Sequence, residues 1–306
     1  MAFLPPPSTA TAAALSSGAF RRDGAVSVRR PARISGVRMG PDAAAAAAAD
    51  GDGVDPPLAP VPNRAGRVKV RRGWSNTTGE LIRRVCEDVW VVERAYDWLT
   101  VDVGGKTTVI RLPDGSLFVH APLLLTVSLK RALAALGPVS VIVVPNTEHV
   151  DGAAQWVASY PDAVALGPPG YAARSGKPLA DVPADNTPPP SFGGVIEHTF
   201  FGSMPLFSES VFFHRPSGTL LTTDLYWNWP SAGVPARTRF FAAGMDWVYK
   251  PVYQALLVRD KGRWAEEMGR VLAWGGGRII PCHGDVLEGV DVPAVLRAHY
   301  ASLLRE

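Results

Sequence analysis

A short apolar run leads directly into a polar loop at residues 141–152, VIVVPNTEHVDG, and this junction limits the possible fold more than any other segment. A continuous run of β-branched residues is typical of a strand that is covered on both faces. The loop that follows carries Asn146, Glu148, His149 and Asp151. Polar side chains therefore gather where a buried strand ends, which marks this loop as a candidate functional site.

The first forty residues differ in composition from the rest, being rich in Ala, Ser and Arg with Asp23 as their only acid. Organellar transit peptides have this composition, and the Ser/Thr/Pro-rich beginning favours a plastid over a mitochondrion. A tail without a targeting function is the alternative. Residues 41–66 hold too few large apolar residues to fold, which indicates a disordered linker. We therefore expect a transit peptide over 1–40 and a single folded domain over 67–306 in the chloroplast stroma.

The positive charge of the chain belongs to this leader. Of 31 basic and 28 acidic residues, six arginines and one aspartate lie in residues 1–38, so the remainder has 25 and 27 and a net charge of −2. This balance gives no support for nucleic-acid binding. No apolar run is long enough to cross a bilayer, so no transmembrane segment is expected. The charge pattern leaves protein partners undefined.

Cys86 and Cys282 are distant in the sequence and match no metal-ligand spacing. We expect two reduced, buried thiols, with one long-range disulfide as the alternative.

The beginning of the folded region predicts an antiparallel β-meander. Gly104-Gly105 and Pro113-Asp114-Gly115 are hairpin signals between apolar, β-branched segments. The predicted strands cover 89–94, 98–103, 106–112 and 116–123.

Helices then alternate with strands. Thr126 is placed to cap a helix that Gly137 would end. A strand at 140–144, a helix at 153–160 and a strand at 163–167 follow. After a turn-rich surface excursion at 168–193, the pattern predicts strands at 195–201, 211–214, 219–225 and 278–281, and helices at 236–274 (interrupted near 260–262) and 292–306. This order favours an α+β or α/β fold of two mixed sheets flanked by helices.

Three segments resemble the ordered landmarks of the metallo-β-lactamase superfamily: the strand-loop-helix at 140–159, the strand ending in TTDL, and the strand entering PCHGDV. That superfamily has a His-x-His-x-Asp-His loop, a later Asp and a late His. When Gly152 is aligned with the glycine that opens the superfamily's helix, His149 falls at the last His of the loop. Asp224 and His283 then match the later Asp and the late His. The resemblance covers roughly residues 85–305 and implies an αββα sandwich.

The sequence also departs from the superfamily's pattern. Val144 and Asn146 stand at its first two His, Glu148 stands at its loop Asp, and its middle His would fall near Leu206. His198 is the only nearby histidine, and its spacing is wrong. With the leader, these departures resemble an uncharacterised plant and cyanobacterial branch known as domain of unknown function 4336.

The resemblance implies at most one divalent ion, zinc, iron or manganese, held by His149, Asp224 and His283, with Glu148 as a further ligand. For ligation at about 2.0–2.2 Å, we expect donor atoms roughly 3–4.5 Å apart. An ion with one open position lowers the pKa of water toward neutrality. A small acyl or phosphoryl substrate would suit this chemistry. The alternative is a catalytically inactive protein, without metal, kept for binding or scaffolding.

Asn146, Tyr226 and Trp227 are the candidate substrate-binding residues. Asn146 would orient a substrate or water, and the two aromatic side chains would cover the cleft. Each also has a structural alternative, since such an Asn often bonds its own loop and such aromatic residues often pack against a helix. His149 and Asp224 have the same kind of alternative, as a loop residue and a turn former.

Overall fold

The computed structural model describes residues 74–76, 79–98, 100–150, 152–175, 178–204, 206–230 and 233–304. The predicted leader at 1–40 and linker at 41–66 lie outside these described residues, as does the predicted start of the domain at residue 67.

Seven strands form the first sheet, in the order β1-β2-β5-β6-β7-β8-β9. Strands β1 to β6 pair antiparallel, whereas β6, β7, β8 and β9 run parallel to one another. The sheet is therefore mixed. Its strands are β1 (Arg83–Cys86), β2 (Val89–Arg94), β5 (Gly105–Arg111), β6 (Leu117–His120), β7 (Val139–Val143), β8 (Val164–Gly167) and β9 (Ala180–Asp181).

Five strands form the second sheet, in the order β10-β11-β12-β13-β14. All its pairs are antiparallel except β12 with β13, which run parallel. This sheet is also mixed. Its strands are β10 (Ile196–Phe201), β11 (Glu209–His214), β12 (Thr219–Thr222), β13 (Arg278–Pro281) and β14 (Leu287–Glu288).

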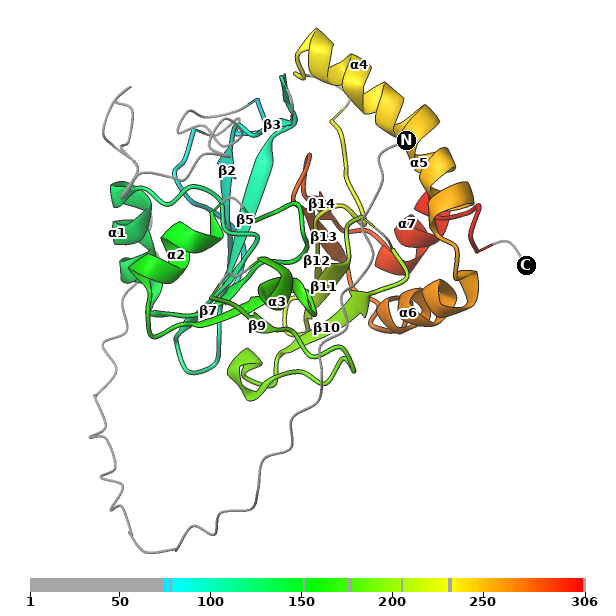
Figure 1. Ribbon diagram of the computed structural model, residues 1–306. Coiled ribbons are helices and arrows are strands. Elements are labelled where there is room, and N and C mark those ends of the chain that lie inside the picture. Colours follow the sequence, from blue (N-terminus) through cyan, green and yellow to red (C-terminus); the bar gives the residue numbers. More distant parts are fainter. Residues whose placement is uncertain are drawn as a thin grey trace, which may run out of the picture. The chain divides into compact units, whose positions relative to one another are not determined.

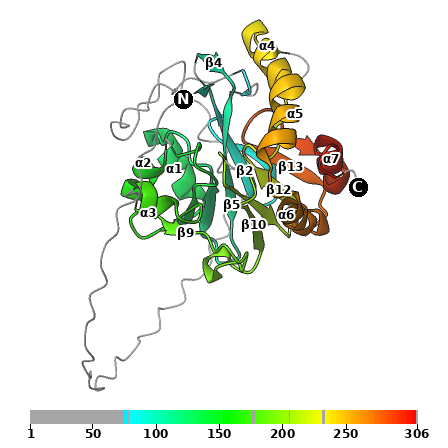
Figure 2. The same ribbon diagram turned by 45° about the vertical axis from the view of Figure 1, so that its right-hand side comes forward.

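The helices cover the two outer faces of the paired sheets (Figure 1). On one side lie α1 (Val127–Leu136) and α2 (Ala153–Ser159), with α3 (Tyr171–Ser175) nearby, and on the other lie α6 (Lys261–Ala273) and α7 (Val292–His299). Between strands β12 and β13 the chain also forms α4 (Ala236–Gly244) and α5 (Lys250–Val252), each followed by a π-helical turn, at Met245–Tyr249 and Tyr253–Leu257. Figure 2 shows the same arrangement from a second side.

Alternation along the strands builds the layers. Val89 and Val91 face the second sheet, while Trp90 and Val92 pack beneath α1 and α2. In the second sheet, Phe212 joins the core between the sheets and its neighbours on β11 face α6 and α7. Successive side chains of a strand point to opposite faces, so apolar residues at every position require cover on both. The fold is the αββα sandwich that the sequence predicted.

Most of the predicted elements are confirmed. Thr126 accepts a hydrogen bond from the Leu129 amide at the start of α1, and Gly137 ends that helix. The helical region after residue 236 is interrupted at Asp260, which caps α6. Both cysteines are free thiols, and Cys282 is buried as predicted, whereas Cys86 is only partly buried. The predicted excursion at 168–193 also contributes an edge strand, β9, to the first sheet.

The predicted strand at 98–103 is wrong. In its place lie two short strands, β3 (Asp97–Trp98) and β4 (Val101–Asp102), which pair only with each other. β2 pairs directly with β5, so that Arg94 faces Gly105 and the predicted Gly104-Gly105 turn does not exist. Asp102 closes the base of this excursion by accepting hydrogen bonds from the amides of Tyr96 and Gly104. The final helix also ends earlier than predicted, at His299.

Among the described residues, no helix combines the length and the apolar character needed to span a bilayer.

Candidate metal centre

Three loops that follow strands bring the candidate ligands together. His149 lies in the loop after β7, Asp224 follows β12, and His283 follows β13. Because β12 and β13 are parallel neighbours, Asp224 and His283 emerge at the same end of the second sheet. The loop after β7 reaches them from the first sheet, with Thr147 donating its amide hydrogen to the carbonyl of Phe207. The site therefore lies at one end of the sandwich, where both sheets contribute to it.

The donor atoms of these three residues converge. His149 Nε2 lies 3.3 Å from His283 Nε2 and 3.3 Å from Asp224 Oδ2, and His283 Nε2 lies 3.9 Å from Asp224 Oδ1. Ligands at about 2.0–2.1 Å in a tetrahedral site stand about 3.3–3.4 Å from one another. The separations suit three ligands of a single ion, and they fall in the range expected from the sequence.

Hydrogen bonds on the far side of each ring fix how the imidazoles point. His283 Nδ1 lies 2.7 Å from the carbonyl oxygen of Gly104, to which it donates, so the Nε2 lone pair faces His149. The Cys282 thiol donates to the carbonyl oxygen of Lys106 and lies 3.4 Å from His149 Nδ1. This contact fixes the direction of Nδ1 and turns His149 Nε2 toward His283 and Asp224. The two Nε2 atoms and the Asp224 carboxylate then face one another, and a metal ion or a shared proton between them would stabilise this arrangement.

Without a metal, a proton takes that place. Burial disfavours the charged imidazolium of His149, but Cys282 and the Asp224 carboxylate outweigh it and raise the pKa of His149 above its ordinary value. Burial, together with the nearby charge of His149, lowers the pKa of His283 to about 4. Burial opposes ionisation of Asp224, yet the contact with His149 keeps the pKa of its carboxyl below the usual range. The group thus holds one positive charge against one negative charge.

Cys282 offers a second donor set with the same two histidines, since ligand atoms of His149, Cys282 and His283 all lie within 4.8 Å of one another. The thiol approaches Nδ1 of His149, whereas His283 and Asp224 approach Nε2. The two ring nitrogens point in different directions, so an ion bound at Nε2 with Asp224 does not share that ring with the thiol.

Asn146 and Glu148 do not enter the cluster in the roles expected of them. Asn146 is fully buried and accepts hydrogen bonds from the amides of Glu148 and His149. Its Nδ2 donates to Thr223 Oγ1 and, at 2.6 Å, to Asp224 Oδ2. Asn146 therefore bonds its own loop, which was the structural alternative, and it also connects this loop to Asp224. Glu148 is exposed in the loop, whereas His149 beside it is buried.

Glu209, which the sequence did not single out, positions Asp224. It is completely buried on β11, and its carboxylate accepts hydrogen bonds from the amides of Thr223, Asp224 and Leu225 at 2.7–2.8 Å. Burial and the charge of Asp224 raise the pKa of Glu209 to about 7, although three N–H groups donate to it. The only signal in the sequence is an acid inside an apolar strand, SESVFFH.

Lys106 is a second positioning residue that the sequence did not reveal. Its side chain is buried, with Nζ 3.0 Å from Glu93 Oε1 and donating to the carbonyl oxygen of Gly284 at 2.9 Å. Gly284 follows His283 and has a φ of +90°. A Cβ there would lie 1.8 Å from the carbonyl oxygen of Asn228, so only glycine fits this turn. Lys106 on the first sheet thus fixes the turn that carries His283 on the second.

Aromatic side chains enclose the imidazoles. Tyr96 stacks on His149 with 6.0 Å between ring centroids, and Trp229 stacks on His283 at 6.4 Å. Tyr226 points away from the imidazoles, whereas Trp227 lies at the edge of the pocket beside Asp224. Tyr226 packs into the core under α6 and α7, and Trp227 donates to Asp246 of the helix above it.

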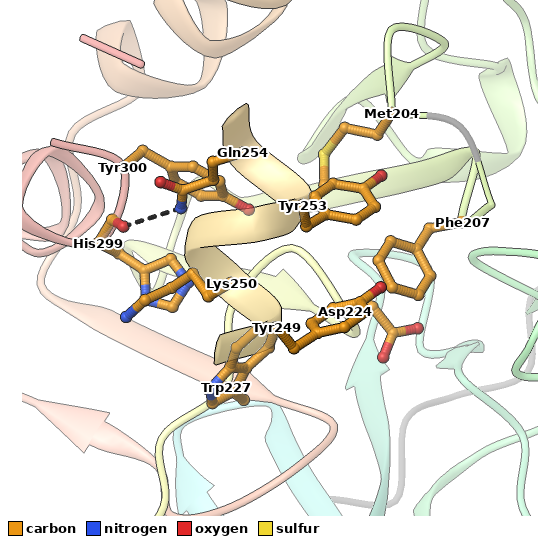
Figure 3. Close-up of a pocket in the computed structure, with 10 residues that line it drawn as sticks. All are labelled: Met204, Phe207, Asp224, Trp227, Tyr249, Lys250, Tyr253, Gln254, His299 and Tyr300. Carbon is orange, nitrogen blue, oxygen red and sulfur yellow. Dashed lines mark hydrogen bonds between the residues drawn. The ribbon is translucent and has the colours of Figure 1, made fainter. Parts of the chain in front are cut away.

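Beside Asp224 is a small pocket with room for about one water molecule (Figure 3). Trp227 contributes to its wall, as do side chains of the helix at 249–254. Burial raises the pKa of Tyr249 to about 12, so its phenol is a neutral hydrogen-bond donor at physiological pH. The lining residues are Met204, Phe207, Asp224, Trp227, Tyr249, Lys250, Tyr253, Gln254, His299 and Tyr300.

The positions that would hold a first metal have structural roles. Val144 is buried in a small apolar cluster beneath α2. Leu206 is exposed with a φ of +79°. His198 lies inside the second sheet, its Nε2 at 2.9 Å from the carbonyl oxygen of Pro183 and its ring stacked on Phe212. His120 is buried against Phe212, which lowers its pKa to about 3. None of the four side chains joins the described ligand cluster.

Solved structures with the same fold are metallo-β-lactamases. DIM-1 metallo-β-lactamase exposed to ceftazidime superposes with a TM-score of 0.50 and 14% identity, covering 72% of this chain and 95% of that one. VMB-1 at pH 5.5 superposes with a TM-score of 0.50 and 10% sequence identity, covering 73% of this chain and 95% of that one. The metallo-β-lactamase from Pontibacter korlensis superposes with a TM-score of 0.48 and 13% sequence identity, covering 74% of this chain and 99% of that one. At these identities the first two establish a shared fold.

A comparison with curated proteins found no match. The family comparison is more specific, because residues 86–239, half of the chain, match the model described as "Domain of unknown function (DUF4336)". The matched segment contains His149 and Asp224, and His283 lies beyond it. The chain belongs to the DUF4336 family and has the metallo-β-lactamase fold.

Proposed function

We propose that this protein is a mononuclear metal-dependent hydrolase whose ion is held by His149, Asp224 and His283. The observation that carries the proposal is the convergence of two imidazole Nε2 atoms and one carboxylate within 3.3–3.9 Å. Both imidazoles are oriented from behind by Gly104 and Cys282, as metal-binding histidines usually are. Zinc, iron and manganese all accept this donor set.

A divalent ion bound there supplies Lewis-acid chemistry, by lowering the pKa of water and polarising a carbonyl or phosphoryl oxygen. The protein's own residues provide the surroundings. Asn146 holds Asp224 through its amide, while Tyr96 and Trp229 exclude bulk water from the imidazole faces. Tyr249 and Lys250 line the small pocket beside Asp224 and offer hydrogen-bond donors to an oxygen of a small acyl or phosphoryl substrate at its mouth. The metallo-β-lactamase neighbours support a hydrolytic reaction class through their names and their fold.

Metal analysis of the purified chain, after reconstitution with each candidate ion, tests this proposal. We expect about one equivalent in the parent protein and less than about a tenth in His149→Ala and His283→Ala, because each variant removes one of only three ligands. Cys282→Ser should keep the ion, since the thiol lies on the Nδ1 side of His149.

His214→Asn is the matched control. This histidine is also buried, at the opposite end of β11 from Glu209, where it bonds Ser217. If His214→Asn lost as much metal as His149→Ala and His283→Ala, the loss in those variants would be due to unfolding and not to a missing ligand. A parent that binds less than about a tenth of an equivalent would exclude the enzyme and leave the second candidate, an inactive protein kept for binding or scaffolding. That candidate draws support from the buried apolar Val144 at a position that would serve a first metal.

We further propose that the protein acts in the plastid stroma and represents a plant and cyanobacterial branch of its family. The composition of residues 1–40 supports this location. A fluorescent protein fused behind residues 1–66 should enter chloroplasts and lose its leader. Replacing the six arginines of the leader by glutamine should leave it in the cytosol, and an unchanged distribution would contradict the proposal.

A further inference from the structure

The helical segment at residues 236–257, named here the arm, carries an apolar outer surface. Phe240 and Trp247 are 85% and 84% exposed, and Leu256 is 66% exposed. The other large apolar side chains exposed on the described residues, Trp98, Val164 and Leu206, are scattered over other elements. In both views the arm, drawn yellow to orange, runs along the edge of the structure beside α6 and α7 (Figures 1 and 2). Exposed apolar side chains concentrated on one element indicate a contact surface.

The exposed residues of the arm repeat every four positions. A four-residue repeat winds around an ordinary α-helix, which has 3.6 residues per turn. The arm alternates α-helical segments with two π-helical turns, whose wider coils offset this drift. The exposed residues therefore form one straight stripe about 25 Å long. From Phe240 to Leu256 every exposed residue of the arm is nonpolar: Phe240, Ala243, Gly244, Trp247, Val248, Pro251, Val252, Ala255 and Leu256.

Both ends of the stripe are basic. Arg237 and Arg239 are exposed at its start, and Arg259 and Lys261 are exposed just beyond its end. The segment 236–261 contains two acids, and both are engaged. Asp246 accepts a hydrogen bond from Trp227 and lies 3.8 Å from Lys250, and Asp260 caps α6. The stripe therefore has a net positive charge at each end, +2 from Arg237 and Arg239 and +1 from Arg259, Asp260 and Lys261 together.

This charge pattern selects among possible partners. A second copy of the arm would place basic ends against basic ends in either orientation, and like charges brought together oppose association. An anionic surface would instead meet cations at both ends of the stripe. Helices with Trp, Phe and Leu on one face and flanking Arg or Lys lie in the headgroup region of bilayers.

We propose that the arm docks this protein on an anionic lipid surface. The stripe from Phe240 to Leu256 lies at the boundary between headgroups and acyl chains, and the arginines at its ends contact lipid phosphates. The inner side of the arm contributes Tyr249 and Tyr253 to the pocket beside Asp224 (Figure 3). Docking thus places the candidate site about one helix diameter, roughly 10 Å, from the lipid.

Flotation of the full-length chain with lipid vesicles tests this proposal. We expect the parent to float with phosphatidylcholine vesicles that contain about 30% phosphatidylglycerol, and to float much less with phosphatidylcholine alone. A double variant, Trp247→Asp with Val252→Asp, should lower the partition coefficient at least about tenfold, because it places two charges in the stripe. Arg239→Glu with Arg259→Glu should weaken binding to the anionic vesicles only.

Val164→Asp is the matched control, because Val164 is a partly exposed apolar residue on β8, outside the arm. It should float like the parent. The arginines of residues 1–38 are present in every variant, so a difference from the parent reports the stripe alone. A parent that does not float, or a stripe variant that floats equally well, would overturn the proposal. A dimer seen by light scattering, lost in the stripe variant and accompanied by no vesicle binding, would also overturn it and assign the surface to a second copy.

Discussion

Lys106→Met is expected to lower the free energy of unfolding by about 3–5 kcal/mol, because it leaves the buried carboxylate of Glu93 without its closest cation. Lys106 lies 3.0 Å from Glu93 and is almost inaccessible to water. Arg83, at 3.3 Å, compensates only in part, because its side chain is partly exposed. The same change removes the hydrogen bond to Gly284 beside His283. Urea unfolding should therefore show lower stability, and metal titration should show weaker affinity.

Two further variants check this explanation. Arg215→Met breaks the exposed pair with Glu197 and should cost no more than about 1 kcal/mol, since surface ion pairs contribute little. Lys106→Met combined with Glu93→Met should recover part of the stability lost in the single variant, because the uncompensated charge is gone. A double variant less stable than Lys106→Met would show that the buried charge is not the cause.

Glu209→Gln is expected to lower the free energy of unfolding by about 3 kcal/mol and to lower metal affinity about 10–100-fold. Glutamine has nearly the same shape, but it replaces one acceptor oxygen with an NH₂ donor. At least one of the amides of Thr223, Asp224 and Leu225 then loses its partner inside the protein. The loop that carries Asp224 should lose its fixed position. Thermal unfolding and competition with a metal-sensitive dye measure the two effects separately.

Glu267→Gln is the control for this second prediction. Glu267 is also buried and accepts hydrogen bonds from the amides of Gly202 and Ser203, but it lies on α6 and does not contact the loop after β12. It should lose comparable stability while keeping the metal affinity of the parent. Equal affinity losses in the two variants would mean that general destabilisation, and not the position of Asp224, weakens metal binding.

The periodicity and order of the elements were sufficient to predict two mixed sheets flanked by helices, because a strand covered on both faces must be apolar at successive positions. The family resemblance supplied the αββα sandwich. Strands β7, β11 and β13 have that pattern, and the caps of α1 and α6 follow from Thr126 and Asp260. The pattern was insufficient between β2 and β5. There, Trp98 to Val103 has the residues of a strand, but Asp102 binds the amides of Tyr96 and Gly104 and closes a separate excursion.

For the candidate site, the sequence determined which residue types follow the strands and in what order. Only the tertiary structure decided that His149, Asp224 and His283 meet, because their separations in space depend on two sheets packing face to face. Only the fold reveals Glu209 and Lys106 as their supports, since a charged residue within a strand becomes informative when its buried partners are known. Sequence alone names the polar groups, and packing decides which of them lose water and must pair with each other.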